Sequence, residues 1–383
     1  MSHILLDVTR LLSRLSDGLR PTGVDRVGLA YVERYGAQAN AVLSERGFSV
    51  VLTDRDSQQV FEMLLSSAHN RRAIQKLVAR SVMNQLRFKN FARSILLHTS
   101  HNGMEFQRYY HAMARRNARS VFMVHDLIPL THAEYCRPGV DDAHRLRIHT
   151  ALQHANGLIA NSQATLDSLA SEADLAGFPL PPTVVAPLAS GVAARPHGPS
   201  PLNHPYFVML GTIEPRKNHW FMLHVWRRLV ERHGAAAPKL IVIGRRGWEC
   251  ENVVDMLDRC SSLRGVVIEE ADCSDDQLHI WLQHARALLF PSFVEGYGMP
   301  LVEALALRVP VLASDLGVFR EIAGGIPDYL DPLDGLNWLA HIEAYSQPAC
   351  TERDAQLARI EDFREPTWSE HFARVDNFLE TLQ

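Results

Sequence analysis

Residues 290–304 read FPSFVEGYGMPLVEA and decide how the second half of the chain folds. A short apolar run that ends at Pro291-Ser292 predicts a buried strand, and a loop with two glycines follows it. Pro300 then stands where a helix begins, a position that proline favours because its missing N–H would be unpaired there. The stretch therefore predicts a strand, a glycine loop and a helix N-terminus, an arrangement suited to binding a diphosphate.

Two acidic residues belong to this stretch and are predicted to lie at different depths of one pocket. Glu295 is in the loop, and Glu303 lies about one turn inside the predicted helix. We expect the free backbone N–H groups of Leu301 and Val302 to point toward the ligand. The alternative explanation for the two glutamates is a helix-capping acid together with an ordinary surface acid.

Residues 211–219 read GTIEPRKNH and follow an apolar run that opens a new strand–helix series. Arg216 and Lys217 are adjacent cations at the predicted junction between strand and helix. Arginine can grip phosphate oxygens in a bidentate manner, and lysine supplies a point charge. An Arg-Lys pair alone would more often be ordinary surface. At the carboxyl end of a strand, together with the glycine loop, it predicts a diphosphate site.

Apolar β-rich runs alternate with amphipathic segments along most of the chain, which predicts parallel sheets covered on both faces. A stretch rich in Pro, Gly and Ala at 193–201 predicts a linker between two doubly wound, Rossmann-like domains. We expect the domains at 1–200 and 201–365, with a last helix at 366–383 packing back on the first. The predicted strands are 3–8, 48–53, 94–98, 120–125, 157–161, 183–187, 206–211, 239–244, 265–269, 287–291, 309–313 and 327–330. The predicted helices include 23–37, 141–155, 219–233 and 275–285, and 56–92 reads as helix without a strand signal.

The composition limits the class of protein. The chain has 383 residues, 46% of them hydrophobic and 21% charged, which is ordinary for a globular protein. No apolar run approaches the roughly 20 residues that span a bilayer, and we expect no signal peptide before the first strand-like run. Five cysteines without paired spacing predict reduced thiols in a cytoplasmic protein. We expect no metal site and no nucleic-acid partner.

The two motifs together resemble glycosyltransferase family four, whose members are retaining enzymes of the GT-B fold. Glu295 and Glu303 match the E-x7-E motif of that family, with Tyr297 in place of the usual Phe. Residues 211–218 match the segment that carries the diphosphate-binding Arg and Lys. The similarity covers about 205–335 of the chain, including the stretches 315–324 and Asp331-Pro332.

That resemblance implies a role for each residue of the donor site. Arg216 and Lys217 would hold the diphosphate, Glu303 the ribose, and Glu295 the sugar hydroxyls near the reacting carbon. The backbone of residues 270–273 would contact the base, just before a predicted capping box, Ser274-x-x-Gln277. The residues expected to bind the donor are Gly211, Arg216, Lys217, Asp272, Cys273, Gly298, Met299, Pro300, Leu301, Val302 and Glu303, with Gly23 from the first half.

The main candidate of the first half is a strand-end histidine. Residues 121–130 read VFMVHDLIPL, so a buried strand ends at His125-Asp126. The segment resembles the mannosyltransferase-like branch of the family, in which a histidine here faces the donor sugar. The alternative is a structural histidine bonded to backbone. Similarly, Asn161-Ser162 matches a family segment but is also explained as the N-cap of the next helix.

Two further features of the first half are less specific. Gly23 would present its backbone to the donor phosphate or the acceptor, but Asp25 stands where many relatives have a second glycine. A helix is predicted to begin at once, which puts the family role of this loop in doubt. His98, Ser100, His101 and Asn102 cluster after another predicted strand, where they could meet the acceptor.

We expect a retaining, metal-independent hexosyltransferase with Arg216, Lys217, Glu295 and His125 as catalytic residues. No obvious carboxylate of the first half could act as a covalent nucleophile, which favours front-face displacement. The resemblance favours a GDP-sugar such as GDP-mannose, with a UDP-sugar as the alternative. The expected acceptor is a glycan or lipid-linked glycan in bacterial-type surface polysaccharide assembly, such as lipopolysaccharide. The competing hypotheses are a sugar-nucleotide epimerase or hydrolase on the same fold, and a non-catalytic subunit of an assembly complex.

Charge is unevenly distributed along the chain. Residues 68–119 hold eleven Lys and Arg but one acid, Glu105, for a net charge of +10. A block of one sign suggests an anionic partner, here the inner face of the cytoplasmic membrane, and the alternative is a solvated helical face. We expect the docking face to include Arg71, Arg72, Lys76, Arg80, Arg87 and Lys89. The apolar residues that would either pack on the domain or enter the lipid are Ile74, Leu77, Val78, Val82, Met83, Leu86 and Phe88.

Overall fold

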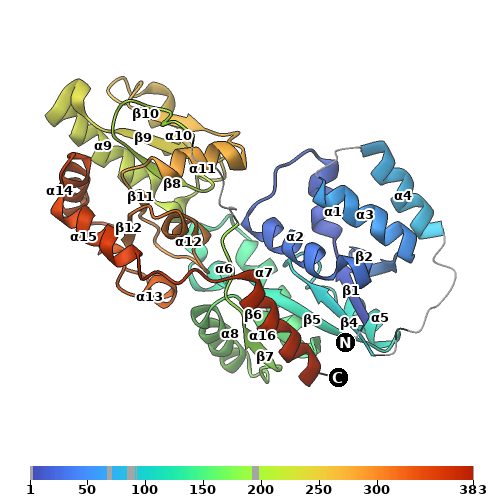
Figure 1. The fold of residues 1–383 in the computed structure, drawn as a ribbon. Coiled ribbons are helices and arrows are strands. Elements are labelled where there is room, and N and C mark those ends of the chain that lie inside the picture. Colours follow the sequence, from blue (N-terminus) through green and yellow to red (C-terminus); the bar gives the residue numbers. More distant parts are fainter. Residues whose placement is uncertain (1–2, 67–70, 84–90, 92, 192–197, 383) are drawn as a thin grey trace. The chain divides into compact units, whose positions relative to one another are not determined.

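The computed structural model describes residues 3–66, 71–83, 91, 93–191 and 198–382, and these form two compact units (Figure 1). The division falls at Leu188, whereas the sequence placed it at 200. Most of the predicted linker, 193–197, lies outside the described residues, but Gly198 already packs on the second unit, where its carbonyl accepts from His284 Nε2 at 2.7 Å. Unit 1 consists of Met1–Leu130, Gly139–Leu188 and Thr367–Gln383, and unit 2 of Thr131–Pro138 and Ala189–Pro366.

Unit 1 is built on a seven-stranded sheet in the order β3-β2-β1-β4-β5-β6-β7. All neighbouring strands are parallel except β2 and β3, which form an antiparallel hairpin. The turn of this hairpin, Arg46-Gly47, has positive φ at both residues, as two-residue hairpin turns often require. The strands are β1 His3–Asp7, β2 Ala39–Glu45, β3 Phe48–Val51, β4 Ser94–His98, β5 Ala118–Val124, β6 Gly157–Ala160 and β7 Thr183–Val185.

Helices cover both faces of this sheet. The predicted helix at 56–92 is two helices, α3 and α4, and residues 67–70, 84–90 and 92 lie outside the described part. The last helix, α16, packs on unit 1, where the His371 ring contacts the Tyr31 hydroxyl at 2.9 Å and the Pro187 carbonyl at 3.0 Å. The helices of unit 1 are α1 Thr9–Ser16, α2 Gly23–Tyr35, α3 Asp54–Leu65, α4 Arg71–Met83, α5 Gln107–Ala114, α6 Ile128–Thr131, α7 Val140–His154, α8 Gln163–Ala176 and α16 Trp368–Thr381.

Unit 2 contains a six-stranded, all-parallel sheet in the order β10-β9-β8-β11-β12-β13. All six strands of the second predicted series are present, within two residues at each end. The strands are β8 Tyr206–Leu210, β9 Lys239–Ile243, β10 Val267–Glu270, β11 Leu288–Phe290, β12 Val311–Ser314 and β13 Asp328–Leu330. The helices are α9 His219–His233, α10 Glu251–Arg259, α11 Asp275–Gln283, α12 Met299–Ala306, α13 Gly317–Ala323, α14 Gly335–Ser346 and α15 Thr351–Ile360.

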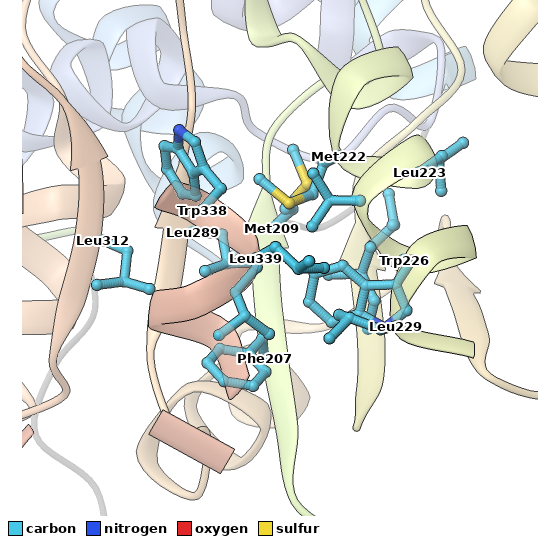
Figure 2. Packing of buried hydrophobic residues seen from close by; sticks show 14 of the residues in the cluster. Phe207, Met209, Met222, Leu223, Trp226, Leu229, Leu289, Leu312, Trp338 and Leu339 are labelled. Carbon is cyan, nitrogen blue, oxygen red and sulfur yellow. The ribbon is translucent and has the colours of Figure 1, made fainter. Parts of the chain in front are cut away.

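The core of unit 2 joins its sheet to α9 and α14. Figure 2 shows Trp226 of α9 beside Phe207 of β8, and their ring centroids are 5.9 Å apart. Both buried indoles keep a hydrogen bond, since Trp226 donates to the Pro238 carbonyl and Trp338 to the Asp331 carbonyl, each at 2.9 Å. This core sets the position of β8, whose carboxyl end carries the Arg-Lys motif.

Candidate active site

The two motifs of the second half meet at one place in the fold. The strand order of unit 2 reverses between β8 and β11, which lie next to each other in the sheet. Residues 211–218 follow β8 and residues 291–303 follow β11. Ligands of open α/β sheets bind outside the carboxyl ends of the strands at such a reversal. The structure therefore places both motifs at the position where this fold binds ligands.

Two glycines shape the end of β8. Gly211 has φ of 140° and Gly244 has φ of 154°, values that residues with a side chain rarely adopt. A Cβ atom at Gly244 would lie 1.9 Å from the Gly211 carbonyl oxygen, so the backbone after β9 lies directly against Gly211. A Cβ at Gly211 would lie 3.3 Å from Lys217 Cε, which puts the Lys217 side chain over this glycine. The sequence interpretation omitted Gly244, although a glycine at a predicted strand end was a usable signal.

Arg216, Lys217 and Glu295 form one ion cluster. Lys217 Nζ donates to Glu295 Oε1 at 2.6 Å, and Arg216 Nη1 donates to Glu295 Oε2 at 2.7 Å. Arg216 Nε lies 2.6 Å from a carboxylate oxygen of Glu214, a buried residue that the sequence interpretation did not single out. Lys217 Nζ also lies 4.9 Å from the centre of the Phe290 ring. Residues about 80 positions apart are thus held together at one strand end.

Burial and charge act in opposite directions on this cluster. Burial by itself would raise the pKa of Glu295, but the charges of Arg216 and Lys217 outweigh it and lower the pKa to about 2. Burial lowers the pKa of Lys217, and the nearby Glu295 carboxylate opposes that shift. Glu295 is therefore an ionised carboxylate at neutral pH that bridges two cations.

Helix α12 begins one residue earlier than the sequence suggested, at Met299. As a result, the N–H groups of Leu301 and Val302 lie inside the first turn and both donate to the Gly298 carbonyl, at 2.9 and 3.3 Å. The prediction that these two groups are free for a ligand is wrong. Gly298 has φ of 121°, and a Cβ there would lie 2.8 Å from the Phe319 ring. Glu303 lies within α12 and its side chain is buried.

The segment after β10 also ends at this edge of the sheet. The Gly244 N–H donates to the Glu270 carbonyl at 3.1 Å, which aligns the end of β10 with the glycines of β8 and β9. Asp272 is exposed and Cys273 is half-buried. The predicted capping box is confirmed: Ser274 N–H donates to Gln277 Oε1 at 2.8 Å, and Gln277 N–H donates to Ser274 Oγ at 3.2 Å.

A short segment distant in sequence packs beside the Glu295 loop. The Tyr135 ring stacks on the Phe293 ring, with centroids 5.4 Å apart and planes 4° from parallel. Trp248 donates its indole N–H to the Tyr135 carbonyl at 3.2 Å. These contacts explain why residues 131–138 group with unit 2 although both flanking segments belong to unit 1. No local signal in the sequence indicated this packing.

In unit 1, His125 follows β5 and is held by three hydrogen bonds. Its ring Nε2 lies 2.8 Å from the Thr99 carbonyl, its backbone N–H donates to His101 Nε2 at 3.0 Å, and its carbonyl accepts from Asn161 Nδ2 at 2.8 Å. Burial lowers the pKa of His125, which favours the neutral ring. Since Nε2–H donates to a carbonyl, Nδ1 carries the lone pair of the ring. The His125 ring is thus hydrogen-bonded to the backbone, as the alternative of a structural histidine predicted. Its Nδ1 atom remains as an acceptor.

Asp25 caps the helix that begins at Gly23. It accepts from the Thr22 backbone N–H and from Arg10 Nε, both at 2.7 Å, and it is 1% exposed. The helix starts immediately, as predicted, and the acid that replaces the second family glycine stabilises its first turn. Ser162 likewise caps α8 by accepting from the Thr165 N–H at 3.0 Å, as its alternative explanation required.

The basic segment is divided among several elements. Arg71, Arg72 and Lys76 are exposed on α4, whereas Arg80 pairs with the buried Asp56. Ile74 and Leu77 are buried and therefore pack on unit 1. Arg87, Lys89, Leu86 and Phe88 lie outside the described residues, as do the side chains of Val82 and Met83.

The structure of the described residues bears on metal binding and on membrane spanning. No group of three His, Cys, Asp or Glu side chains in this part of the chain is arranged to hold a metal ion. No described helix is long and apolar enough to cross a membrane.

The GT-B fold is confirmed by solved structures that match the whole chain. The complex of Anabaena Alr3699/HepE with UDP and glucose has a TM-score of 0.67 at 15% identity, and the match covers 100% of this chain and 99% of that one. An α,α-trehalose 6-phosphate synthase from Burkholderia multivorans has a TM-score of 0.63 at 10% identity, with 100% and 99% covered. At such low identities these likenesses show the fold alone.

Sequence matches to one family within that fold cover part of the chain. Residues 193–325 match the family described as glycosyl transferases group 1. The serotype-specific mannosyltransferase WbdA of Escherichia coli is 29% identical over 251 residues, which are 59% of this chain and 29% of WbdA. The O-antigen chain mannosyltransferase B of E. coli is 33% identical over 137 residues, 36% of this chain and 35% of that protein. The resemblance to GT-B glycosyltransferases near the mannosyltransferase branch is thus confirmed, although the chain spans about a third of these relatives or less.

Proposed function

We propose that the chain transfers a hexose from a nucleoside-diphosphate sugar, with retention at the anomeric carbon and without a metal. The observation that carries this proposal is the cluster of Arg216, Lys217 and Glu295 at the strand reversal of a group 1 domain. Two cations beside an ionised carboxylate suit a substrate that has a diphosphate at one end and sugar hydroxyls at the other. Alr3699/HepE, which shares the fold, has been crystallised with UDP and with UDP-glucose, a donor of this kind.

The proposed mechanism separates charge at the diphosphate. As the bond between the anomeric carbon and the phosphate oxygen breaks, negative charge gathers on the phosphate, where Arg216 and Lys217 would stabilise it. Such donors are worth roughly 3–4 kcal/mol each. The acceptor hydroxyl attacks on the same face and gives its proton to the departing phosphate oxygen. His125, through Nδ1, would interact with hydroxyls of the sugar as positive charge develops.

We infer the donor from the names of the relatives. WbdA and the O-antigen enzymes are named as mannosyltransferases, which favours GDP-mannose, while the UDP complexes of Alr3699/HepE keep a UDP-sugar as the alternative. The same relatives favour a glycan or lipid-linked glycan acceptor in O-antigen or other surface polysaccharide assembly, at the inner face of the cytoplasmic membrane.

We expect GDP to raise the unfolding temperature more than UDP, ADP or dTDP in a thermal-shift screen. A ligand at 100 times its dissociation constant should add about 2.7 kcal/mol to the free energy of unfolding. The sugar donor that carries the nucleotide with the largest thermal shift is then incubated with the protein and glycan acceptors. NMR of the product reports the anomeric configuration. An absence of any shift with all four nucleotides, or fast conversion of the donor without acceptor, would contradict the proposal.

We expect a chelator to leave transfer unchanged. The cations of Arg216 and Lys217 would neutralise the leaving group, which is the task that a divalent ion performs in other enzymes. The measurement is turnover with and without excess EDTA, after dialysis. Activity that is lost with EDTA and restored by Mg²⁺ or Mn²⁺ would show that the metal-free mechanism is wrong.

We expect reversible docking on anionic membranes through α4. Arg71, Arg72 and Lys76 are exposed, and each cation near an anionic surface contributes roughly 1 kcal/mol. In liposome flotation, the chain should float with anionic vesicles, stay unbound with neutral ones, and be released at about 0.5 M salt. Reversing these three charges to Glu should abolish flotation, while the control R227E/R228E on α9 should float normally. Equal flotation of both variants would contradict the assignment.

A further inference from the structure

Tyr135 of unit 2 is held on two sides by loops that follow different strands. Its ring stacks on the ring of Phe293, which follows β11, with centroids 5.4 Å apart and planes 4° from parallel. Its carbonyl accepts from the indole N–H of Trp248, which follows β9, at 3.2 Å. Strands β9 and β11 lie on either side of β8 in the sheet (Figure 1). Tyr135 therefore joins the loops of the two strands that flank β8, whose own loop carries the Arg-Lys motif.

Both of these loops are also hydrogen-bonded to the loop after β8. The Gly247 N–H donates to the Ile213 carbonyl at 3.0 Å, and a Cβ at Gly247 would lie 2.6 Å from that oxygen. On the other side, the Phe293 N–H donates to the Arg216 carbonyl at 2.9 Å. The three loops are thus bonded into one layer, and Tyr135 connects its two outer members.

Phe293 begins a run of three residues that all bond to Arg216. Besides the bond from Phe293 N–H, the Arg216 guanidinium donates to the Val294 carbonyl at 3.2 Å and to Glu295 Oε2 at 2.7 Å. A displacement of Phe293 would therefore move the backbone that carries Glu295 relative to Arg216. Hydrogen bonds weaken steeply as their geometry departs from the optimum. The position of the Phe293 ring thus affects how the Glu295 carboxylate is held.

Further ring contacts hold the segment around Tyr135 on unit 2. The His132 ring stacks on the Tyr135 ring, with centroids 6.1 Å apart and planes 13° from parallel. The Arg137 guanidinium lies 5.7 Å from the centre of the Trp248 ring. Offset stacks and cations over rings are both attractive arrangements. Tyr135, Phe293 and Trp248 are half-buried, so replacing Tyr135 should disturb the loops and leave the buried core of unit 2 in place.

We propose that Tyr135 is a positioning residue for Glu295. Its ring fixes Phe293, and through Phe293 and Arg216 it holds the carboxylate that would contact the donor sugar. The inference rests on the function proposed above, which assigns that contact to Glu295. It concerns the sugar end of the donor, because the proposed ribose contact, Glu303, lies within α12.

The first test compares turnover with nucleotide affinity in the full chain. Y135A should lower kcat about tenfold, because the loss of an aromatic stack loosens the loop, while the affinity for GDP stays unchanged. Y135F should behave like the wild type, since the phenyl ring keeps the stack. The matched control is Y329A, which removes a half-buried tyrosine of β13 whose hydroxyl donates to the Gly324 carbonyl at 3.0 Å, and it should keep normal turnover.

Three outcomes of this test would overturn the proposal. The first is normal turnover in Y135A with a normal unfolding temperature. The second is a loss in Y135F as large as in Y135A, which would assign the effect to the hydroxyl instead of the stack. The third is a parallel loss of GDP affinity in Y135A, which would show general damage to the site.

A double-mutant cycle tests whether Tyr135 acts through Phe293. F293A should lower kcat by a similar factor, and Y135A/F293A should be no worse than either single variant, because both remove the same stack. Y135A/Y329A should instead show the sum of its two single effects, as expected for residues without shared partners. Additive losses in Y135A/F293A would show that the two residues act independently, which contradicts the proposal.

Hydrogen exchange supplies a measurement that does not depend on sugar transfer. The Phe293 N–H, bonded to the Arg216 carbonyl, should exchange about tenfold faster in Y135A than in the wild type or Y135F, with exchange in α9 unchanged. Faster exchange in a chain that transfers no sugar would support the positioning of the Glu295 loop and overturn the proposed function. Normal exchange and normal transfer in Y135A would overturn the role of Tyr135 alone.

Discussion

Replacing Lys217 by alanine should lower turnover on the order of 100-fold or more while the fold survives. The Lys217 ammonium is buried, lies over Gly211 and bonds Glu295 at 2.6 Å, so its position is fixed before any substrate arrives. A preorganised charge of this kind stabilises a leaving diphosphate without first having to reorient. R216A should have an effect of similar size, since Arg216 holds the other oxygen of Glu295.

The measurement is turnover with the donor selected by the nucleotide screen, alongside the unfolding temperature of each variant. Glu295 keeps one cationic partner in either variant, which limits the loss of stability. The matched control is K239A, because Lys239 lies at the amino end of β9 and donates to the Gly265 carbonyl at 2.7 Å, at the opposite edge of the same sheet. Near-normal turnover in K217A or R216A would show that the substituted residue does not stabilise the leaving diphosphate as proposed.

The strands of unit 2 were predictable because buried parallel strands are continuous apolar runs. Leu240–Ile243 and Leu288–Phe290, for example, are buried throughout and stand out from their surroundings. Strand β2 was missed because Asn40, Ser44 and Glu45 interrupt its apolar run, and because its hairpin turn uses Arg46 rather than Asn or Asp. Strand prediction failed where polar residues pair through side-chain bonds, such as Asn40 Nδ2 to Asp54 Oδ1 at 2.8 Å.

The residues of the site were predictable from the sequence, but the contacts between them were less so. The motifs indicated Arg216, Lys217 and Glu295 separately, but the ion cluster that joins them depends on β8 and β11 being neighbours. The aromatic stack of Tyr135 on Phe293 joins residues with no shared pattern. The error at Leu301 and Val302 arose because a shift of one residue in the start of α12 decides which N–H groups have a carbonyl partner.

Glu295 and Glu303 should respond differently to substitution. The ion pairs of Glu295 make this expectation more specific. Glu295 occupies both Arg216 and Lys217, so E295Q leaves these cations available to a diphosphate. E295Q should bind GDP at least as tightly as the wild type, while turnover falls on the order of 100-fold because contacts to the donor sugar are lost. E303Q should weaken GDP, since the proposed partner of Glu303 is the ribose.

Calorimetry with GDP and turnover with the sugar donor test this difference. The same measurements on E295A and E303A repeat the test without the amide group that glutamine introduces. The pH dependence provides an internal control. Because the pKa of Glu295 is about 2, the carboxylate is ionised throughout pH 5 to 8, and protonation would release the cations only far below that range. The difference in GDP affinity between E295Q and the wild type should therefore stay constant over pH 5 to 8. Equal loss of GDP binding in the Glu295 and Glu303 variants would contradict the division of roles.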